Sequence, residues 1–166
     1  MMMKRRAGRS FDAARFAQPA AWEGRPLVDR DVVAGRLLLL TQALQDIERE
    51  FPGDARALAA NPVVRAAIER WLQVAIEVCI DVAYHVIADR GWGPPDRAAD
   101  AFDLLAARGM LDADLASRLG SAVGLRNVLV HEYVKVDLER PVRVIRDGLG
   151  DLRAFAAGAA AWLEEA

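Results

Sequence analysis

Residues 61–90 read NPVVRAAIERWLQVAIEVCIDVAYHVIADR, and this stretch decides the fold. Asn61 fits the cap of a helix and Pro62 its first position, because the Asn side chain accepts a backbone N–H and the first helical residue needs no N–H of its own. A run rich in Gly and Pro, residues 91–95, breaks the chain afterwards. The sequence therefore predicts one helix over residues 62–90, roughly 40 Å long at 1.5 Å per residue.

This predicted helix is apolar on more than one side, which indicates that several neighbours cover it. It is either the centre of a bundle or a helix shared with a second subunit. One polar line survives, with a member at every fourth residue: Glu69, Gln73, Glu77, Asp81 and His85. The line has two interpretations, a solvated stripe or, in part, the border of a catalytic cleft. On the second interpretation Glu77 and Asp81 are the possible cleft-lining residues.

Apolar residues recur at spacings of three and four on both sides of this helix. Stop signals divide these segments into helices. Before the long helix the sequence predicts a helix at 29–50 and a short one at 54–60. After it we expect a helix at 96–108 with Asp96 as its cap, one from Asp112 or Asp114 through the segment 125–133, and, after a break at 137–141, a last one at 142–164. We find no internal repeat and no second domain. We expect an all-α protein, a four- to five-helix up-and-down bundle over residues 28–166, after an N-terminal extension, residues 1–27, that we expect to be partly disordered.

Composition excludes several classes of protein. The formal net charge of −2 argues against coating nucleic acid by bulk electrostatics, although a local cluster of arginines can still hold a phosphate. The single cysteine, Cys79, allows no disulfide within the chain and fits a reducing cytoplasm, and a packing role is favoured over a nucleophilic one. The basic start, residues 1–10, precedes no signal-peptide-like segment, and no run of about 20 uncharged apolar residues exists. We expect a cytoplasmic protein without a membrane span.

The chemistry concentrates in residues 125–133, which read LRNVLVHEY. Arg126 offers a fork of donors that matches a phosphate, and His131 can exchange a proton near neutral pH. Asn127 can donate to an oxyanion or hold the His ring, and Tyr133 has a hydroxyl and a face that stacks on a base.

The spacing of these residues leaves the geometry open. Asn127 and His131 share a helix face, whereas Arg126 and His131 lie about 140° apart around the axis. Either the helix is distorted, or long side chains bend round, or another surface completes the site; a dimer cleft would supply that surface.

Other chemistries lack their residues. The two histidines and the single cysteine show no metal-ligand spacing, and the chain has no Gly-rich phosphate loop, no nucleophile elbow and no kinase motif. We therefore expect no metal and no cofactor. An RNA substrate supplies its own nucleophile, the 2′-hydroxyl, so that a base and a cation at the phosphate suffice for cleavage.

Arg126-Asn127, three apolar residues, then His131-x-Tyr133 resembles the signature of HepT-like proteins in the HEPN superfamily. The segments 64–83 and 100–119 resemble the second helix of that family and the pair that follows it, and the resemblance covers about residues 28–166. It implies a homodimeric HEPN-like bundle with the motif in a cleft between subunits.

The resemblance also implies an activity, that of a metal-independent RNA endonuclease acting as the toxin of a type VII-like toxin–antitoxin pair. The implied partner is a minimal nucleotidyltransferase antitoxin that transfers AMP to the motif tyrosine. Carried over by position, Arg126 and His131 are catalytic with Asn127 in support, and Tyr133 contacts substrate and is modified.

Two alternatives remain. The first is a non-catalytic helical module that binds a nucleotide or a nucleotidyltransferase. A phosphate-binding site needs the same groups as a site that cleaves RNA, so the motif fits both. A plain dimeric scaffold is disfavoured, since four such groups are not needed to hold a helix.

Overall fold

Helices joined by short loops account for the part of the chain that this computed structural model describes, residues 30–131 and 137–165. In chain order they are α1 (Arg30–Glu50), α2 (Ala55–Ala60), α3 (Pro62–Asp89), α4 (Ala98–Ala107), α5 (Ala113–His131), α6 (Glu139–Arg143), a π-helical segment (Val144–Gly148) and α7 (Leu149–Glu165). The described residues contain no strand. The expected all-α bundle is confirmed.

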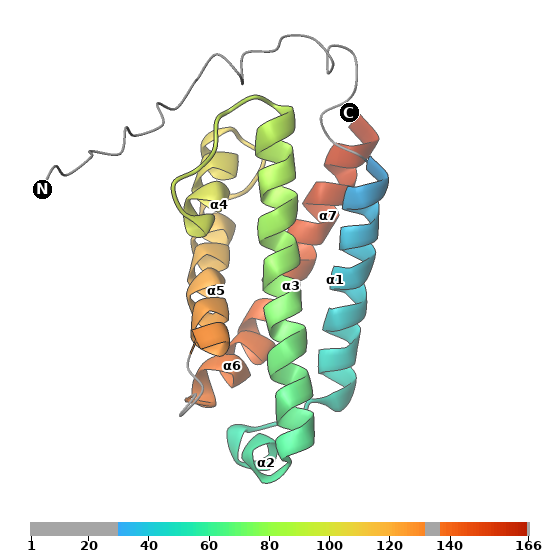
Figure 1. Cartoon of the computed structure of the whole chain (residues 1–166), viewed down its shortest axis with the longest axis vertical. Coiled ribbons are helices and arrows are strands. Elements are labelled where there is room, and N and C mark those ends of the chain that lie inside the picture. The colour runs from blue at the N-terminus through green and yellow to red at the C-terminus, as the bar shows by residue number, and fades with distance from the viewer. Residues whose placement is uncertain (1–29, 132–136, 166) are drawn as a thin grey trace, which may run out of the picture.

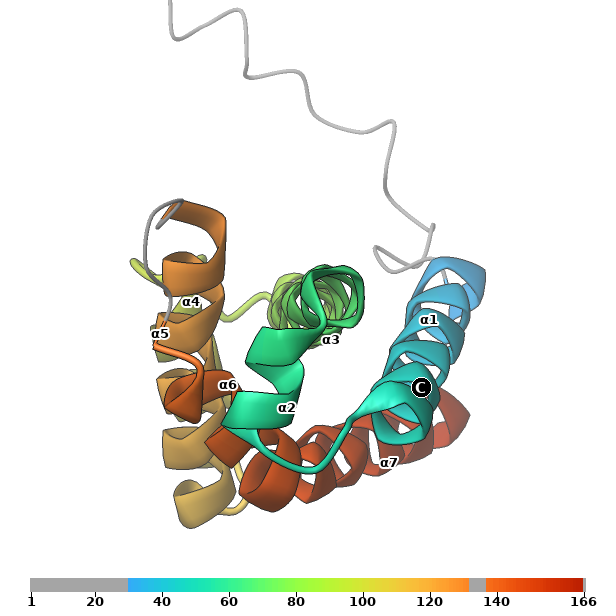
Figure 2. The same ribbon diagram turned by 90° about the horizontal axis from the view of Figure 1, so that it is seen from below.

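Helix α3 lies in the middle of the bundle (Figure 1). Seen along its axis, it has α1 on one side, the α4–α5 pair on the other and α7 on a third, while no described helix covers the fourth side (Figure 2). A half-exposed stripe along α3 agrees with this arrangement and includes Ala67, Trp71, Val74, Glu77, Asp81 and Tyr84. The long helix is thus the centre of the bundle, with one side left open.

The ends of α3 follow the sequence signals. Asn61 Oδ1 accepts a hydrogen bond from the Val64 N–H at 3.2 Å, as expected for the cap. At the other end Gly91 takes a positive φ of 65°, which a residue with a side chain rarely adopts. The N–H of Trp92 then returns to the carbonyl of Ile87 at 3.1 Å and closes the helix.

The start of α4 differs from the prediction, and the start of α5 decides between Asp112 and Asp114. Helix α4 is capped at Arg97 and not at Asp96, because Asp100 reaches back and accepts the Arg97 N–H at 3.1 Å. Helix α5 starts after Asp112, whose carboxylate accepts the N–H groups of Asp114 and Leu115 at 2.9 and 3.1 Å. A carboxylate at a helix start satisfies donors that have no partner within the helix.

The C-terminal helix begins earlier than expected, at Glu139 in place of residue 142, so that the predicted break at 137–141 is too long. Pro141 fits inside because it lies in the first turn of α6, where its missing N–H costs nothing. The π-helical turn at Val144–Gly148 then joins α6 to α7. Arg146 donates to the carbonyl of Gly53 at 2.5 Å and ties this turn to the loop after α1.

The core runs along α3 and consists of aliphatic side chains from every long helix, with Phe102 and Phe155 packed edge to face at 5.7 Å between ring centres. Each large apolar side chain buried here contributes about 1.5–3 kcal/mol relative to its exposed state. Cys79 is fully buried among them, and burial raises the pKa of its thiol far above the ordinary value. The packing role expected of Cys79 agrees with this position.

By length and composition alone α3 would suffice to cross a membrane. However, 56% of its most apolar window is buried inside the bundle. The core helix of a soluble protein has the same composition, so the apolar length of α3 is explained by its central place in the fold.

Candidate functional site

Arg126, Asn127 and His131 lie in the last turns of α5, which is described as far as His131. Asn127 and His131 occupy positions on one face of this helix, and Arg126 starts from another. Tyr133 lies outside the described residues, and the described contacts do not include the side chain of His131. The roles expected of His131 and Tyr133 therefore stay predictions.

The guanidinium of Arg126 points from α5 toward α3 and meets Glu77. Arg126 Nε lies 2.5 Å from Glu77 Oε2, and both atoms are closed off from solvent. They meet as an ion pair without the alignment of a hydrogen bond. The whole side chains are 26% and 40% exposed, so other atoms of both groups stay open to a ligand.

The same guanidinium also bends back along its own helix. Arg126 Nη1 donates to Asn127 Oδ1 at 3.2 Å. The three geometries that the spacing left open for Arg126 and His131 stay open, because this contact joins Arg126 to its neighbour Asn127. Arg126 thereby links the open side of α3 with the face of α5 on which Asn127 lies.

The structure separates the two acids proposed to line a cleft. Asp81 pairs with Arg36 of α1 at 2.6 Å, one helical turn beyond Glu77. Glu77 also borders a hollow of ≈190 Å³ between α1 and α3, together with Arg36, Arg70 and Gln73. Asp81 is thus neutralised from α1, whereas Glu77 is the acid that contacts the motif.

Another member of the polar line follows the simpler interpretation. Glu69 pairs with Arg65 on the same helix at 2.8 Å, four residues apart. Pairs four residues apart on one helix contribute only about 0.3–0.5 kcal/mol. The described contacts of the line are therefore a pair within α3 at Glu69 and contacts with other helices at Glu77 and Asp81.

A larger hollow, ≈390 Å³, lies beside Asn127 and was missed by the sequence analysis. Its floor is the face of α5 that carries Gly120 and Gly124, and its wall is the start of α4 with Arg97 and Asp103. The available signal was the pair of glycines one turn apart, on the same helix face as Asn127 and His131.

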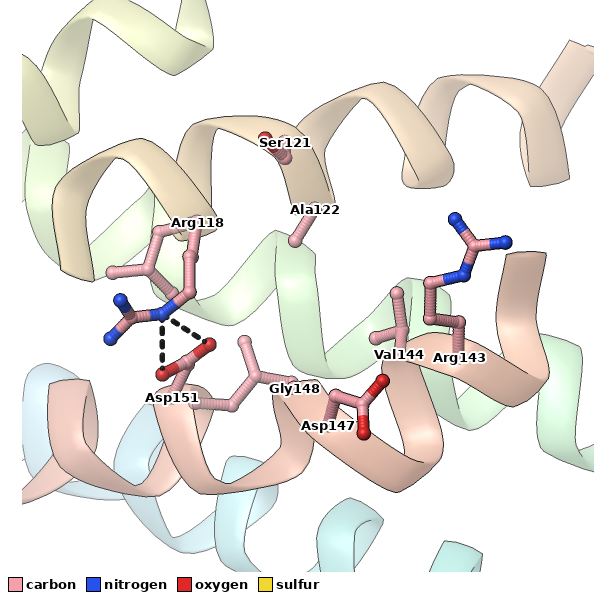
Figure 3. Close-up of a pocket in the computed structure, with 10 residues that line it drawn as sticks. Arg118, Ser121, Ala122, Arg143, Val144, Asp147, Gly148 and Asp151 are labelled. Atoms are coloured by element: carbon pink, nitrogen blue, oxygen red, sulfur yellow. Dashed lines mark hydrogen bonds and ion pairs between the residues drawn. The ribbon is translucent and has the colours of Figure 1, made fainter. Parts of the chain in front are cut away.

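A further hollow of ≈200 Å³ lies between α5 and the start of α7 (Figure 3). Across it Arg118 Nε donates to both carboxylate oxygens of Asp151 at 3.0 Å, and Arg143 and Asp147 lie at its other end. The Arg118 side chain is 55% exposed, so this pair contributes little to stability. Arg118 starts two turns before Arg126, and its ion-pair partner among the described residues is Asp151, not a motif residue.

Potential metal ligands do not gather in the described parts of the chain. Among residues 30–131 and 137–165 no three of His, Cys, Asp and Glu lie together closely enough to hold a metal ion. The polar groups that do meet are Arg126, Asn127 and Glu77, which suit an anionic ligand held by a guanidinium.

A comparison with known families matches residues 40–158 to the family described as Ribonuclease HepT-like. The match runs from α1 into α7 and includes Glu77, Arg126, Asn127 and His131. The chain belongs to the HepT-like ribonuclease family. The expected membership of the HepT-like family is confirmed, and so is the HEPN-like fold class.

Curated relatives agree with this family. The chain is 28% identical over 125 residues to the mRNA nuclease HepT of Shewanella oneidensis. The aligned region covers 75% of this chain and 93% of the relative. It is also 35% identical over 69 residues to the tRNA nuclease HepT of Aphanizomenon flos-aquae. This alignment covers 42% of this chain and 47% of the relative.

A solved structure matches the same region. The tri-AMPylated HEPN toxin of Shewanella oneidensis, in complex with its MNT antitoxin, superposes with a TM-score of 0.73 at 27% identity, covering 79% of this chain and 98% of the toxin. The HepT-like fold and the ribonuclease class are therefore established for this chain.

Proposed function

We propose that this chain is a toxin ribonuclease that cuts RNA without a metal and is neutralised by a nucleotidyltransferase antitoxin. The proposal is supported by the named nuclease and toxin relatives. The observation that carries it is that Glu77 and Asn127 hold the Arg126 guanidinium. Arg126 and Asn127 lie on α5 about one turn before His131. We expect the protein in the cytoplasm.

In the proposed reaction His131 takes the proton of the 2′-hydroxyl. The 2′-oxygen attacks phosphorus, and the bond from phosphorus to the 5′-oxygen breaks. A proton then passes to the leaving oxygen, and the products are a 2′,3′-cyclic phosphate and a 5′-hydroxyl. Arg126 donates to the phosphate oxygens as charge builds on them.

Glu77 takes the part of a positioning residue in this scheme. Its carboxylate holds the Nε side of the Arg126 guanidinium, while Asn127 accepts from Nη1. A guanidinium fixed at both edges loses less conformational freedom when a phosphate arrives, which favours the reacting geometry.

The open side of α3 is the proposed contact between two copies of the chain. Half-exposed Trp71, Val74 and Tyr84 lie along it, and exposed Leu38 and Leu39 of α1 add apolar surface. Because Arg126 reaches toward this side, pairing two copies would bring both motifs to one cleft. Such a cleft would supply a second surface, one of the three ways in which Arg126 and His131, about 140° apart on the helix, could act on one phosphate.

Tyr133 is the proposed site of AMP transfer by the antitoxin. From the sequence alone, a spacing of seven residues puts Tyr133 and Arg126 on one face of a continuous helix. On that arrangement AMP on the Tyr133 hydroxyl would place a phosphate beside the cation and fill the cleft with a purine. Co-expression with the nucleotidyltransferase should add one or more adenylyl groups to the Tyr133 peptide in mass spectrometry. An inhibited toxin with unmodified Tyr133 would contradict this part of the proposal.

The alternative is a non-catalytic module that binds a nucleotide or the nucleotidyltransferase. The test compares cleavage of total RNA by the wild type, Arg126→Ala and Arg118→Ala, since both arginines lie on α5 and pair with an acid of another helix. We expect Arg126→Ala to lose cleavage by about 100-fold or more and Arg118→Ala to retain it. Equal activity of both variants would overturn the assignment of Arg126.

A further inference from the structure

We propose that the hollow between α4 and α5 binds a guanine base of the RNA next to the bond that is cut. The inference rests on the proposed function, because Asn127 forms one end of this hollow. It adds a base preference to the activity and assigns it to Arg97 and Asp103. We refer to the hollow as the α4–α5 furrow.

Gly120 and Gly124 occupy successive turns of α5 along the floor of the furrow. A Cβ added at Gly120 would lie 3.7 Å from Ala99 Cβ of α4, so this glycine lies against the wall and the open part of the floor is at Gly124. A Cβ added at Gly124 would meet no atom within 4 Å. Glycine in a helix costs about 1 kcal/mol relative to alanine, and here it keeps the helix surface open to a flat ligand. The volume of ≈390 Å³ lies within the range of about 300–1,000 Å³ typical of small-ligand sites.

The wall of the furrow carries one guanidinium and two carboxylates from α4 and its cap, Arg97, Asp100 and Asp103. Arg97 donates through Nε and Nη2 to Asp100 at 3.2 and 2.9 Å, which leaves its Nη1 group available. Asp103 is exposed, and its charge acts on Arg97 without a hydrogen bond or ion pair closing on its oxygens within the described segments. The furrow thus offers a guanidinium and an exposed carboxylate.

The charges on this wall favour a base over a phosphate. One arginine and two aspartates line it, a net charge of −1, which repels a phosphate. A carboxylate instead accepts from the N–H groups of a base edge, and a guanidinium donates to ring nitrogen and carbonyl acceptors. Guanine carries two adjacent N–H donors together with the O6 and N7 acceptors, so it satisfies both groups.

The position of the furrow fixes which nucleotide it reads. It ends at Asn127, and His131 occupies the same face of α5 one turn further on. A base in the furrow therefore belongs to a nucleotide directly beside the phosphate held by Arg126. The preference should appear at one position next to the cut and nowhere else.

The main experiment uses the full-length protein and single-stranded oligonucleotides that contain one guanosine among uridines, with inosine or adenosine at the same position as comparison. Inosine lacks only the exocyclic amino group. We expect the wild type to cut beside guanosine about tenfold faster than beside inosine. Asp103→Asn should still cut RNA but lose the difference in rate between guanosine and inosine. The control is Asp147→Asn, which replaces an exposed acid on the π-helical segment and should keep the difference.

A second variant fills the furrow without removing a contact. Gly124→Leu places a side chain on its floor, and Gly150→Leu is the matched control, since that glycine is also exposed in a helix with nothing within 4 Å of an added Cβ. We expect Gly124→Leu to slow cleavage beside guanosine by tenfold or more, with no loss for Gly150→Leu. Asp103→Asn decides the question alone if Gly124→Leu changes the fold or the oligomeric mass.

Equal rates for guanosine and inosine in the wild type, or an unchanged preference in Asp103→Asn, would overturn the inference while leaving the ribonuclease proposal intact. Absence of any cleavage would contradict the proposed function itself. In that case fluorescence anisotropy with oligonucleotides that lack the 2′-hydroxyl at the cut position tests the furrow separately. Tighter binding of guanine in the wild type but not in Asp103→Asn would support it, and equal binding would overturn it.

Discussion

At the scale of single residues, the contact between Arg126 and Glu77 gives the motif its geometry. Arg126 Nε and Glu77 Oε2 come from helices α5 and α3 and are both shielded from solvent. A charged group left buried without its partner is costly, which makes the pair sensitive to replacement of either member. The neighbouring Asp81 differs, because Arg36 on α1 already neutralises it.

Replacing Glu77 tests its positioning role. We expect Glu77→Gln to lower kcat of RNA cleavage by roughly tenfold, because the amide keeps the shape and loses the charge that holds Arg126. Restoration of activity in Glu77→Asp would support positioning by a carboxylate. The matched control is Glu69→Gln, which removes a carboxylate of the same helix whose ion-pair partner in the described part of the chain is Arg65. Equal kcat in Glu77→Gln and the wild type would contradict this role.

At the scale of elements, the sequence predicts the helices whose signals are local. Helix α3 begins at Asn61-Pro62 and ends before Gly91 because capping and chain-breaking residues act within a few positions. The start of α4 was misplaced by one residue, since the effect of Asp100 on Arg97 depends on the conformation of both side chains. The π-helical turn at Val144–Gly148 has no comparable sequence signal.

The candidate site shows the same division between local and distant interactions. The pairing of Glu69 with Arg65 follows from a spacing of four residues. The choice between Glu77 and Asp81 as the partner of Arg126 does not follow from sequence spacing. It depends on where α5 and α1 pack against α3. The polar line left two interpretations open, a solvated stripe and a border of the site, and only the packing of the helices shows that Glu77 meets Arg126 and Asp81 meets Arg36.

The central place of α3 has a consequence for the response to pH. Burial raises the pKa of Cys79 in the folded protein, whereas the unfolded thiol ionises near its ordinary value of 9.0. Above that value the unfolded state releases a proton that the folded state keeps, so the free energy of unfolding falls as pH rises, by up to about 1.4 kcal/mol per pH unit for this group.

Chemical denaturation between pH 8 and pH 10.5 measures this effect. We expect the wild type to lose stability more steeply than Cys79→Ala, which lacks the thiol, while both cleave RNA at similar rates at neutral pH. Parallel loss of stability in the two proteins would show that Cys79 is not shielded as the structure describes.

At the scale of the whole molecule, the uncovered side of α3 predicts association. Light scattering at micromolar concentration should give about twice the mass of the 18.2 kDa chain. Val74→Arg places a charge on this side and should yield a monomer with little cleavage. Val63→Arg, at a position 79% exposed near the start of α3, is the control and should remain dimeric. A monomeric, fully active wild type would rule out a cleft formed by two copies.

The central claim is that Arg126 and His131 cut RNA through the 2′-hydroxyl without a metal. The most direct measurement is mass spectrometry of the products from a defined oligonucleotide, cut by the purified protein in excess chelator. The account predicts that cleavage persists, that each cut leaves a 2′,3′-cyclic phosphate and a 5′-hydroxyl, and that His131→Ala yields neither. Loss of cleavage in chelator, or products with 3′-hydroxyl and 5′-phosphate ends, would contradict it.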